Sequence, residues 1–167
     1  MQTFTRFLLQ AFLIASLIGC GFHLRGSTNL AFKSISIQGS TLTISKSLNQ
    51  SLIANGVTIF PASIDANAAT NPDLMLELIG EENEKRILSL SGQGVVNEFE
   101  LYYRVHYRTK LAGESLWSQV QTTEARRDFS YSDANLLAKQ DEEKRLNENM
   151  QADVLNNLMR RLSTLKK

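Results

Sequence analysis

The stretch FELYYRVHYRTKL, from Phe99 to Leu111, has the clearest periodicity in this chain. Its apolar side chains fall on one face and most polar side chains on the other: Phe99, Leu101, Tyr103, Val105, Tyr107 and Leu111 against Glu98, Glu100, Tyr102, Arg104, His106, Arg108 and Lys110. A period of two over thirteen residues predicts a half-buried antiparallel strand about 43 Å long.

The segments on either side supply partner strands. Gly113 marks a hairpin turn, and the residues from Leu116 to Phe129 are expected to return as a strand. Upstream, alternating leucines from Leu74 to Leu78 predict a strand that resumes from Ile87 to Ser91. The charged stretch GEENEKR between these two pieces is a bulge, a twisted edge or a loop.

Two helices and two shorter strands complete the predicted domain. Alternation from Lys33 to Gly39 predicts a first strand, and Val57 to Phe60 a short second one. Between them a helix is expected from about Thr43 to Asn55, with Leu48, Leu52 and Ile53 at helical spacing.

The C-terminal third carries an apolar stripe at spacings of four and three: Leu146, Met150, Val154, Leu158, Leu162 and Leu165. This stripe predicts a helix from Asp133 to Leu165, although the charged residues at the start of the segment could form a loop instead. The expected fold is α+β, a two-layer sandwich with a mainly antiparallel sheet of four to five strands and two helices on one face.

Composition excludes several function classes. The chain has 167 residues, 43% of them hydrophobic and 21% charged, which is enough apolar material for a core without disulfides. The formal charge is +1, so the basic footprint of a nucleic-acid-binding protein is missing. Two histidines and one cysteine argue against a metal centre, and no cofactor is expected.

The N-terminus has the layout of a signal peptide. Arg6 supplies the positive charge, and the apolar run from Phe7 to Ile18 would span about 18 Å as a helix. This is shorter than the roughly 30 Å of a bilayer core, so we expect a cleaved leader. The mature chain would carry equal numbers of acidic and basic side chains.

The only cysteine follows this apolar run, in the sequence Leu17-Ile18-Gly19-Cys20. The sequence resembles a bacterial lipobox, which implies that Cys20 is lipidated and becomes the first residue of the mature protein. The other interpretations are a reactive thiol, a buried cysteine or an intermolecular disulfide. We therefore expect a leader over 1–19, a lipidated linker over 20–32 and a single domain over 33–167.

No catalytic constellation is recognisable. Ser91 and His106 are the nearest candidates for a lipid-active hydrolase, but the sequence contains neither G-x-S-x-G nor H-E-x-x-H. We therefore expect no catalytic residues and no enzyme.

The polar face of the long strand needs another explanation. Arg104, His106 and Arg108 could bind phosphates, line a wet interface or pair with carboxylates on neighbouring strands. These three residues are the candidates for an interface with a partner protein.

The heptapeptide CGFHLRG, from Cys20 to Gly26, resembles the mature N-terminus of the LPS-assembly lipoprotein family LptE, also called RlpB. Further agreement follows in order along the chain: NGV at 55–57, LAK at 137–139 and RRL at 160–162. The resemblance implies an outer-membrane lipoprotein that plugs the LptD β-barrel in a one-to-one complex. The complex inserts lipopolysaccharide into the outer leaflet.

The resemblance also implies sites for lipopolysaccharide. Lys139, in LAK, aligns with a basic residue implicated in lipopolysaccharide binding. A second basic site of the family lies at the tip of a hairpin, where this chain has Ser89, Leu90 and Ser91. Lys85 and Arg86 are the nearest substitutes. The alternative function is a lipid-anchored periplasmic binding module or envelope scaffold without a barrel partner.

Overall fold

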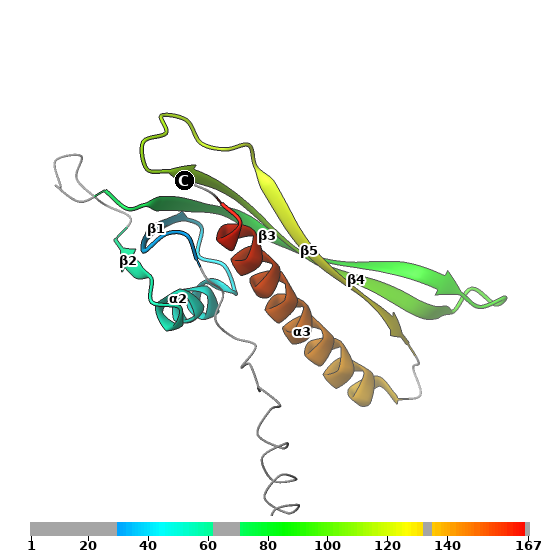
Figure 1. The fold of residues 1–167 in the computed structure, drawn as a ribbon. Helices are drawn as coiled ribbons and strands as arrows, with labels where there is room; N and C mark the ends of the chain where they lie inside the picture. The colour runs from blue at the N-terminus through cyan, green and yellow to red at the C-terminus, as the bar shows by residue number, and fades with distance from the viewer. Residues whose placement is uncertain (1–29, 62–70, 132–134, 166–167) are drawn as a thin grey trace, which may run out of the picture.

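A computed structural model describes residues 30–61, 71–131 and 135–165. The described elements are β1 (Ser34–Gly39), α2 (Ser45–Ala54), β2 (Thr58–Phe60), β3 (Leu74–Leu90), β4 (Val96–Leu111), β5 (Gln121–Ser130) and α3 (Leu136–Ser163). The strands form one five-stranded sheet in the order β2-β1-β3-β4-β5 (Figure 1).

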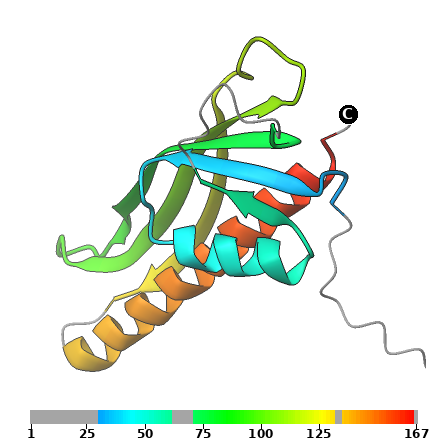
Figure 2. The same ribbon diagram turned by 90° about the vertical axis from the view of Figure 1, so that its left-hand side faces the viewer.

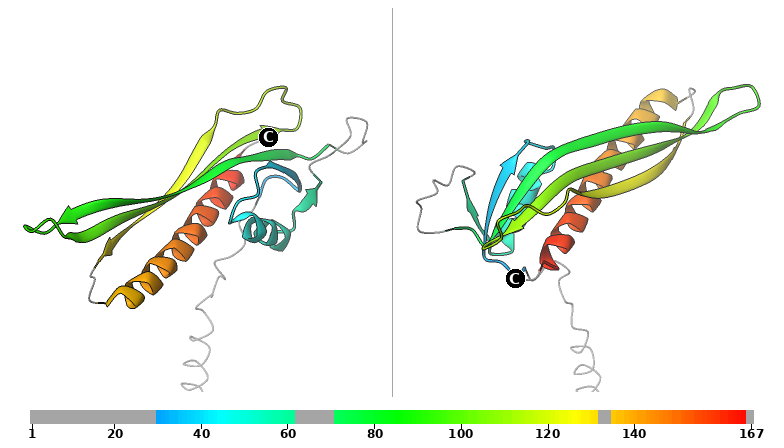
Figure 3. Two further views of the ribbon diagram at one scale, coloured as in Figure 1. Left: turned by 180° about the vertical axis from the view of Figure 1, so that it is seen from behind. Right: turned by 90° about the horizontal axis from the view of Figure 1, so that it is seen from above.

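The sheet is mixed. β1 runs parallel to both β2 and β3, whereas β3, β4 and β5 form a long antiparallel meander. Both helices lie on the same face of the sheet, as the turned views in Figures 2 and 3 show. We call this the helix face and the opposite one the open face. The predicted α+β sandwich, with a mostly antiparallel sheet and two helices on one face, is confirmed.

The unit β1-α2-β2 differs from its prediction in detail. Leu48 and Leu52 are fully buried, but Ile53 is 63% exposed and does not contribute to the core. α2 begins at Ser45, two residues later than expected, because the Ser45 hydroxyl accepts a hydrogen bond from the Leu42 backbone N–H and closes a turn there. Thr43 therefore lies before the helix.

β3 is one continuous strand, and its charged stretch from Gly80 to Arg86 pairs regularly with β4, directly after a bulge. Two further register shifts lie near the end of β3, between Ile87 and Leu90. Leu78 is opposite Tyr107 and Gly80 is opposite His106, so Ile79 is an extra residue in β3. An extra residue reverses which side chains face each side of the sheet. Leu74, Leu76 and Leu78 are buried on the helix face before the bulge, and after it the odd-numbered residues Glu81 to Ile87 take that face.

β1 approaches β3 most closely just before this bulge. Gly39 is opposite Leu78 in the parallel register and has a φ of 95°. A Cβ atom at this position would lie 2.2 Å from the Leu78 carbonyl oxygen. Glycine is therefore required both for the backbone conformation and for the space.

β5 is shorter than predicted. It begins at Gln121 rather than Leu116, because the preceding residues form a loop on side-chain hydrogen bonds. The Ser118 hydroxyl accepts the Thr109 N–H at 3.0 Å, and the Glu114 carboxylate accepts the Leu111 N–H at 3.1 Å. The Ser118 N–H still donates to the Thr109 carbonyl at 2.8 Å, but the regular ladder between β4 and β5 begins only at Gln121.

α3 starts at Leu136, so the charged stretch near its beginning is helical. Met150, Val154, Leu158 and Leu162 of the predicted stripe are fully buried, while Leu146 and Leu165 pack against the core and are partly exposed. Within the described ranges, neither helix combines the length and the apolar character needed to cross a membrane.

Glu81 is the first residue of β3 after the bulge to lie on the helix face, and it ties the loop before α2 to the sheet. Its carboxylate accepts hydrogen bonds from the Tyr103 hydroxyl at 2.6 Å and from the Thr43 backbone and hydroxyl at 3.0 and 2.7 Å. Burial raises the pKa of Glu81, but these hydrogen bonds outweigh it and leave the pKa below its ordinary value.

We expect Gly39→Ala to destabilise the domain by about 2 kcal/mol or more, because it combines a strained backbone with a clash against the Leu78 carbonyl. Urea unfolding measures the effect. Gly80→Ala is the control, since Gly80 has no positive φ and a Cβ there meets nothing within 4 Å. Equal stability of the two variants would show that β1 does not approach β3 in this way.

We expect Glu81→Gln to cost about 1 kcal/mol at neutral pH, because the charge-assisted hydrogen bonds become neutral ones. The folded state lowers the pKa of Glu81, so this contribution is complete above the ordinary value of 4.5 and is lost as the pH falls through the lowered pKa. Unfolding of wild type and variant should therefore converge in acid. Glu148→Gln, an exposed change without side-chain partners in the described residues, should show no such convergence.

Candidate functional site

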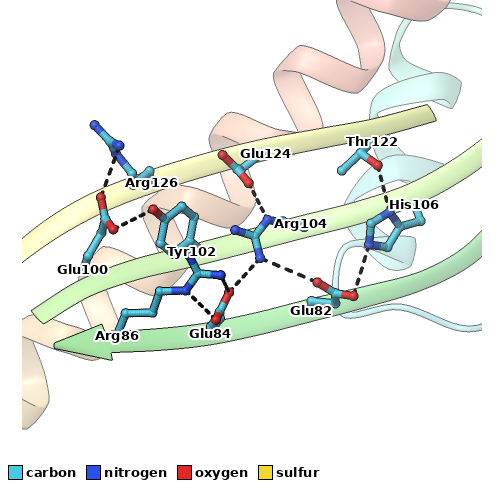
Figure 4. Close-up of polar contacts among 10 residues, drawn as sticks. All are labelled: Glu82, Glu84, Arg86, Glu100, Tyr102, Arg104, His106, Thr122, Glu124 and Arg126. Carbon is cyan, nitrogen blue, oxygen red and sulfur yellow. Dashed lines mark hydrogen bonds and ion pairs between the residues drawn. The ribbon is translucent and has the colours of Figure 1, made fainter. Parts of the chain in front are cut away.

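The three interface candidates lie in a row on the open face of β4. Arg104, His106 and Arg108 alternate with the buried Tyr103, Val105, Tyr107 and Thr109 of the helix face, as the sequence period predicts. Figure 4 shows Arg104 and His106 of this row with their neighbours on β3 and β5. Each candidate contacts an acidic side chain across the sheet.

Arg104 is the centre of the network. Its guanidinium donates to Glu84 at 2.8 Å and to Glu124, and lies 3.6 Å from Glu82. The hydrogen bonds to Glu84 and Glu124 raise the pKa of Arg104 and keep it charged. Its side chain is only 17% exposed, so the network shields it from solvent.

The Tyr102 ring lies within cation–π range of two arginines on this face. The Arg104 guanidinium lies 4.4 Å from the Tyr102 ring centroid and that of Arg86 lies 4.9 Å from it. The Tyr102 hydroxyl donates to Glu100 at 2.5 Å, and this bond raises the pKa of the phenol. Glu100 in turn pairs with Arg126 on β5 at 3.2 Å.

His106 and Arg108 are also engaged within the sheet. The His106 ring lies 2.8 Å from the Thr122 hydroxyl and 3.4 Å from the Glu82 carboxylate. Arg108 pairs with Glu77 and stacks on Trp117 at 5.1 Å from the ring centroid. Of the three alternatives for this face, cross-strand pairing is therefore the one that the described residues adopt.

The open face is not basic as a whole. In the strand register, carboxylates outnumber lysines and arginines on it: Glu77, Glu82, Glu84, Glu98, Glu100, Glu124 and Asp128 against Arg86, Arg104, Arg108, Lys110 and Arg126. A phosphate approaching this face would meet more negative charges than positive ones. The geometry is that of a polar, internally neutralised surface.

The lipopolysaccharide candidates are divided between the two faces. Arg86 lies on the open face and is held by Glu84, to which it donates at 2.5 and 2.8 Å. Lys85 lies on the helix face and forms an ion pair with Glu143 of α3 at 2.7 Å. Consecutive residues of a strand face opposite sides of the sheet, and the bulge at Ile79 decides that Lys85 rather than Arg86 lies on the helix face.

Lys139 joins Lys85 rather than Arg86. Its ammonium donates to the Ser130 hydroxyl at 3.0 Å and to Glu142 at 2.8 Å. Both lysine ammoniums lie 5.5 Å from the centroid of the Phe129 ring. We call Lys85 and Lys139 the ammonium pair.

Sequence reasoning missed the aromatic surroundings of this pair. The Lys85 ammonium lies 4.2 Å from the Phe99 ring centroid and 5.9 Å from that of Tyr131, within cation–π range. The rings come from β4, the end of β5 and the residue after it. Only the strand register, in which Ile87, Phe99 and Phe129 are opposite one another, could have indicated this cluster.

The two hydrolase candidates do not meet. Ser91 lies in the turn of the β3–β4 hairpin, where its hydroxyl accepts the Val95 N–H at 3.1 Å. His106 is opposite Gly80, so roughly 30 Å of strand separates the two residues. The described residues contain no cluster of three or more side chains that could hold a metal ion.

Cys20 and the predicted leader lie outside the described residues, as does most of the linker before the domain. Their assignments remain predictions.

Comparison with known proteins gives one consistent result. Residues 32–162 match the family model described as LptE, lipopolysaccharide-assembly. The LPS-assembly lipoprotein LptE of Photorhabdus laumondii is 30% identical over 153 residues, which cover 88% of this chain and 79% of that protein. The protein of the same name from Yersinia pestis is 27% identical, over 88% of this chain and 70% of its own length.

Two solved structures agree with this result. Lipoprotein B of Nitrosomonas europaea has a TM-score of 0.69 at 33% identity and covers 86% of this chain and 90% of that one. Rare lipoprotein B of Shewanella oneidensis has a TM-score of 0.66 at 26% identity, over 78% of this chain and 94% of that one. The chain therefore belongs to the LptE family of non-enzymatic lipopolysaccharide-assembly lipoproteins, which confirms the expected family and the expected absence of an enzymatic role.

Proposed function

We propose that this protein is the lipoprotein subunit of the outer-membrane lipopolysaccharide translocon, where it plugs the LptD β-barrel in a one-to-one complex. The observation that carries the proposal is the family match over 32–162, which spans nearly all of the described fold. The proposed anchor is a lipid on Cys20, outside the described residues.

The open face supports a polar contact with a barrel wall. The network holds Arg104 and Arg108 against carboxylates of the same sheet, so their charges are compensated before a partner arrives. A surface of this kind can be wet and still specific, because ordered waters bridge the remaining polar groups. Arg104, His106 and Arg108 thus remain our candidates for the barrel interface.

The helix face supports contact with lipopolysaccharide. The ammonium pair places two positive charges around one aromatic ring, and phosphate is the anionic group that lysine binds as a point charge. Arg86, on the other face, is a separate and weaker candidate, because Glu84 already binds it through two nitrogens. We assign the principal lipopolysaccharide contact to Lys139 with Lys85.

We expect the tagged full chain, purified from its own outer membrane in mild detergent, to carry a much larger β-barrel with it in equal amount. Quantitative mass spectrometry identifies the partner and its stoichiometry, and the same sample gives the mass of the mature N-terminus. Recovery of a monomer without a barrel would favour the free lipid-anchored module. An unmodified Cys20 would remove the proposed anchor.

We expect Lys139→Glu to weaken lipopolysaccharide binding about tenfold in low salt, because a charge-assisted contact becomes a repulsion. Lys144→Glu is the matched control: it makes the same charge change on α3, at an exposed residue without side-chain partners in the described ranges. Titration with labelled lipopolysaccharide measures both, and thermal unfolding checks that the fold is retained. Equal loss in the two variants would mean that only net charge matters.

A further inference from the structure

The two halves of α3 are attached to the sheet in different ways. In the described structure its fully buried residues are Met150, Val154, Leu158, Met159 and Leu162, all in the second half. Residues 136–149 have no fully buried side chain, and Leu146 alone of their apolar residues packs partly against the core. Hydrophobic burial therefore holds the second half far more firmly than the first.

The contacts that hold the first half are mostly polar. Lys85 of β3 reaches Glu143, and Lys139 reaches Ser130 at the end of β5. The four side chains of the two lysine–glutamate pairs are between 20% and 45% exposed. Ion pairs at such exposure contribute little to stability and exchange readily with other ions.

The start of the helix adds little further stability. Asn135 is at the N-cap, but its side chain makes no capping hydrogen bond. The first turn has no acidic residue to interact with the helix dipole. Residues 136–149 are therefore the part of α3 that can separate from the sheet at the lowest cost.

We propose that Glu142 and Glu143 compete with the bound lipid for the ammonium pair. Phosphate on an anionic lipid replaces both carboxylates, and the first half of α3 then loosens from the sheet. This inference rests on the proposed function, which assigns lipopolysaccharide to Lys85 and Lys139. It adds that Glu142 and Glu143 lower the affinity for lipopolysaccharide, and that the first half of α3 moves when the lipid binds.

The charges favour this exchange. Each ammonium has one carboxylate partner at 2.7 or 2.8 Å, so an anion that binds either lysine has to displace a glutamate. A phosphate monoester carries between one and two negative charges, so it can take the place of a carboxylate beside an ammonium. The displaced glutamates lie near the surface and regain water. The Phe99 ring keeps the Lys85 ammonium in place on the sheet during the exchange.

The test compares two doubly substituted full-length proteins of equal charge. Glu142→Gln/Glu143→Gln removes the competing carboxylates. Asp141→Asn/Glu148→Gln removes two carboxylates of the same helix that contact no lysine in the described structure. We expect the first protein to bind lipopolysaccharide about fivefold more tightly than the second, from the modest free energy of two exposed ion pairs.

Hydrogen exchange on the wild-type protein gives an independent readout that needs no variant to fold. Lipopolysaccharide should speed amide exchange in residues 136–149 and leave residues 150–163 unchanged. Lipopolysaccharide stripped of its phosphates should leave amide exchange in both ranges unchanged. Phosphatidylglycerol vesicles show whether a phosphodiester on another lipid has the same effect, in which case the site selects phosphate rather than lipopolysaccharide.

The outcomes separate this inference from the proposed function. If Lys139→Glu weakens binding while the two double variants bind alike and exchange in 136–149 does not rise, the competition by Glu142 and Glu143 is wrong and the lipopolysaccharide site stands. If neither the wild type nor the Glu142→Gln/Glu143→Gln protein binds lipopolysaccharide, both proposals are wrong.

Discussion

The bulge at Ile79 is the constraint on which the rest of the structure depends. Before it, three leucines of β3 face the helices and complete the core with β1 and α2. After it, the alternation is reversed, so Lys85 faces α3 and Arg86 joins the open face. A straight strand would exchange these two residues and place a guanidinium beneath the helix. Gly39 contributes to the same constraint, because the absence of a side chain lets β1 approach Leu78, the last residue before the bulge.

The two parts of β3, before and after the bulge, are stabilised by different interactions. On one side, β1, β2 and α2 cover β3 with fully buried aliphatic side chains such as Leu48 and Leu74. On the other side, β3 extends beyond β1 and is held by β4, by a ladder of ion pairs and by lysines packed on aromatic rings. Ion pairs near the surface stabilise less than buried hydrocarbon does. Local opening should therefore concentrate in the part where the candidate ligand residues lie.

The sequence predicts β4 and the buried stripe of α3 well, because alternation and helical spacing record burial directly. It cannot place the bulge. The stretch from Gly80 to Arg86 contains no large apolar residue, so no contrast between faces marks which side chains point inward. The role of Glu142 and Glu143 is hidden for the same reason: their partners are set by the register of strands far away in the chain. Recognition of the family came from short motifs, including one outside the described residues.

The two faces of the sheet suit different ligands: the helix face suits an anionic ligand and the open face suits a polar partner protein. On the open face, each arginine of β4 is already matched by a carboxylate, and the surplus of negative charge repels phosphate. On the helix face, two ammoniums share one aromatic ring, and their two carboxylates lie on the loosely packed half of a helix. A phosphate therefore gains more from the helix face, where the competing charges can move away. On the open face the competing carboxylates are fixed in the sheet. That rigidity suits a surface that contacts the wall of a barrel without binding lipopolysaccharide.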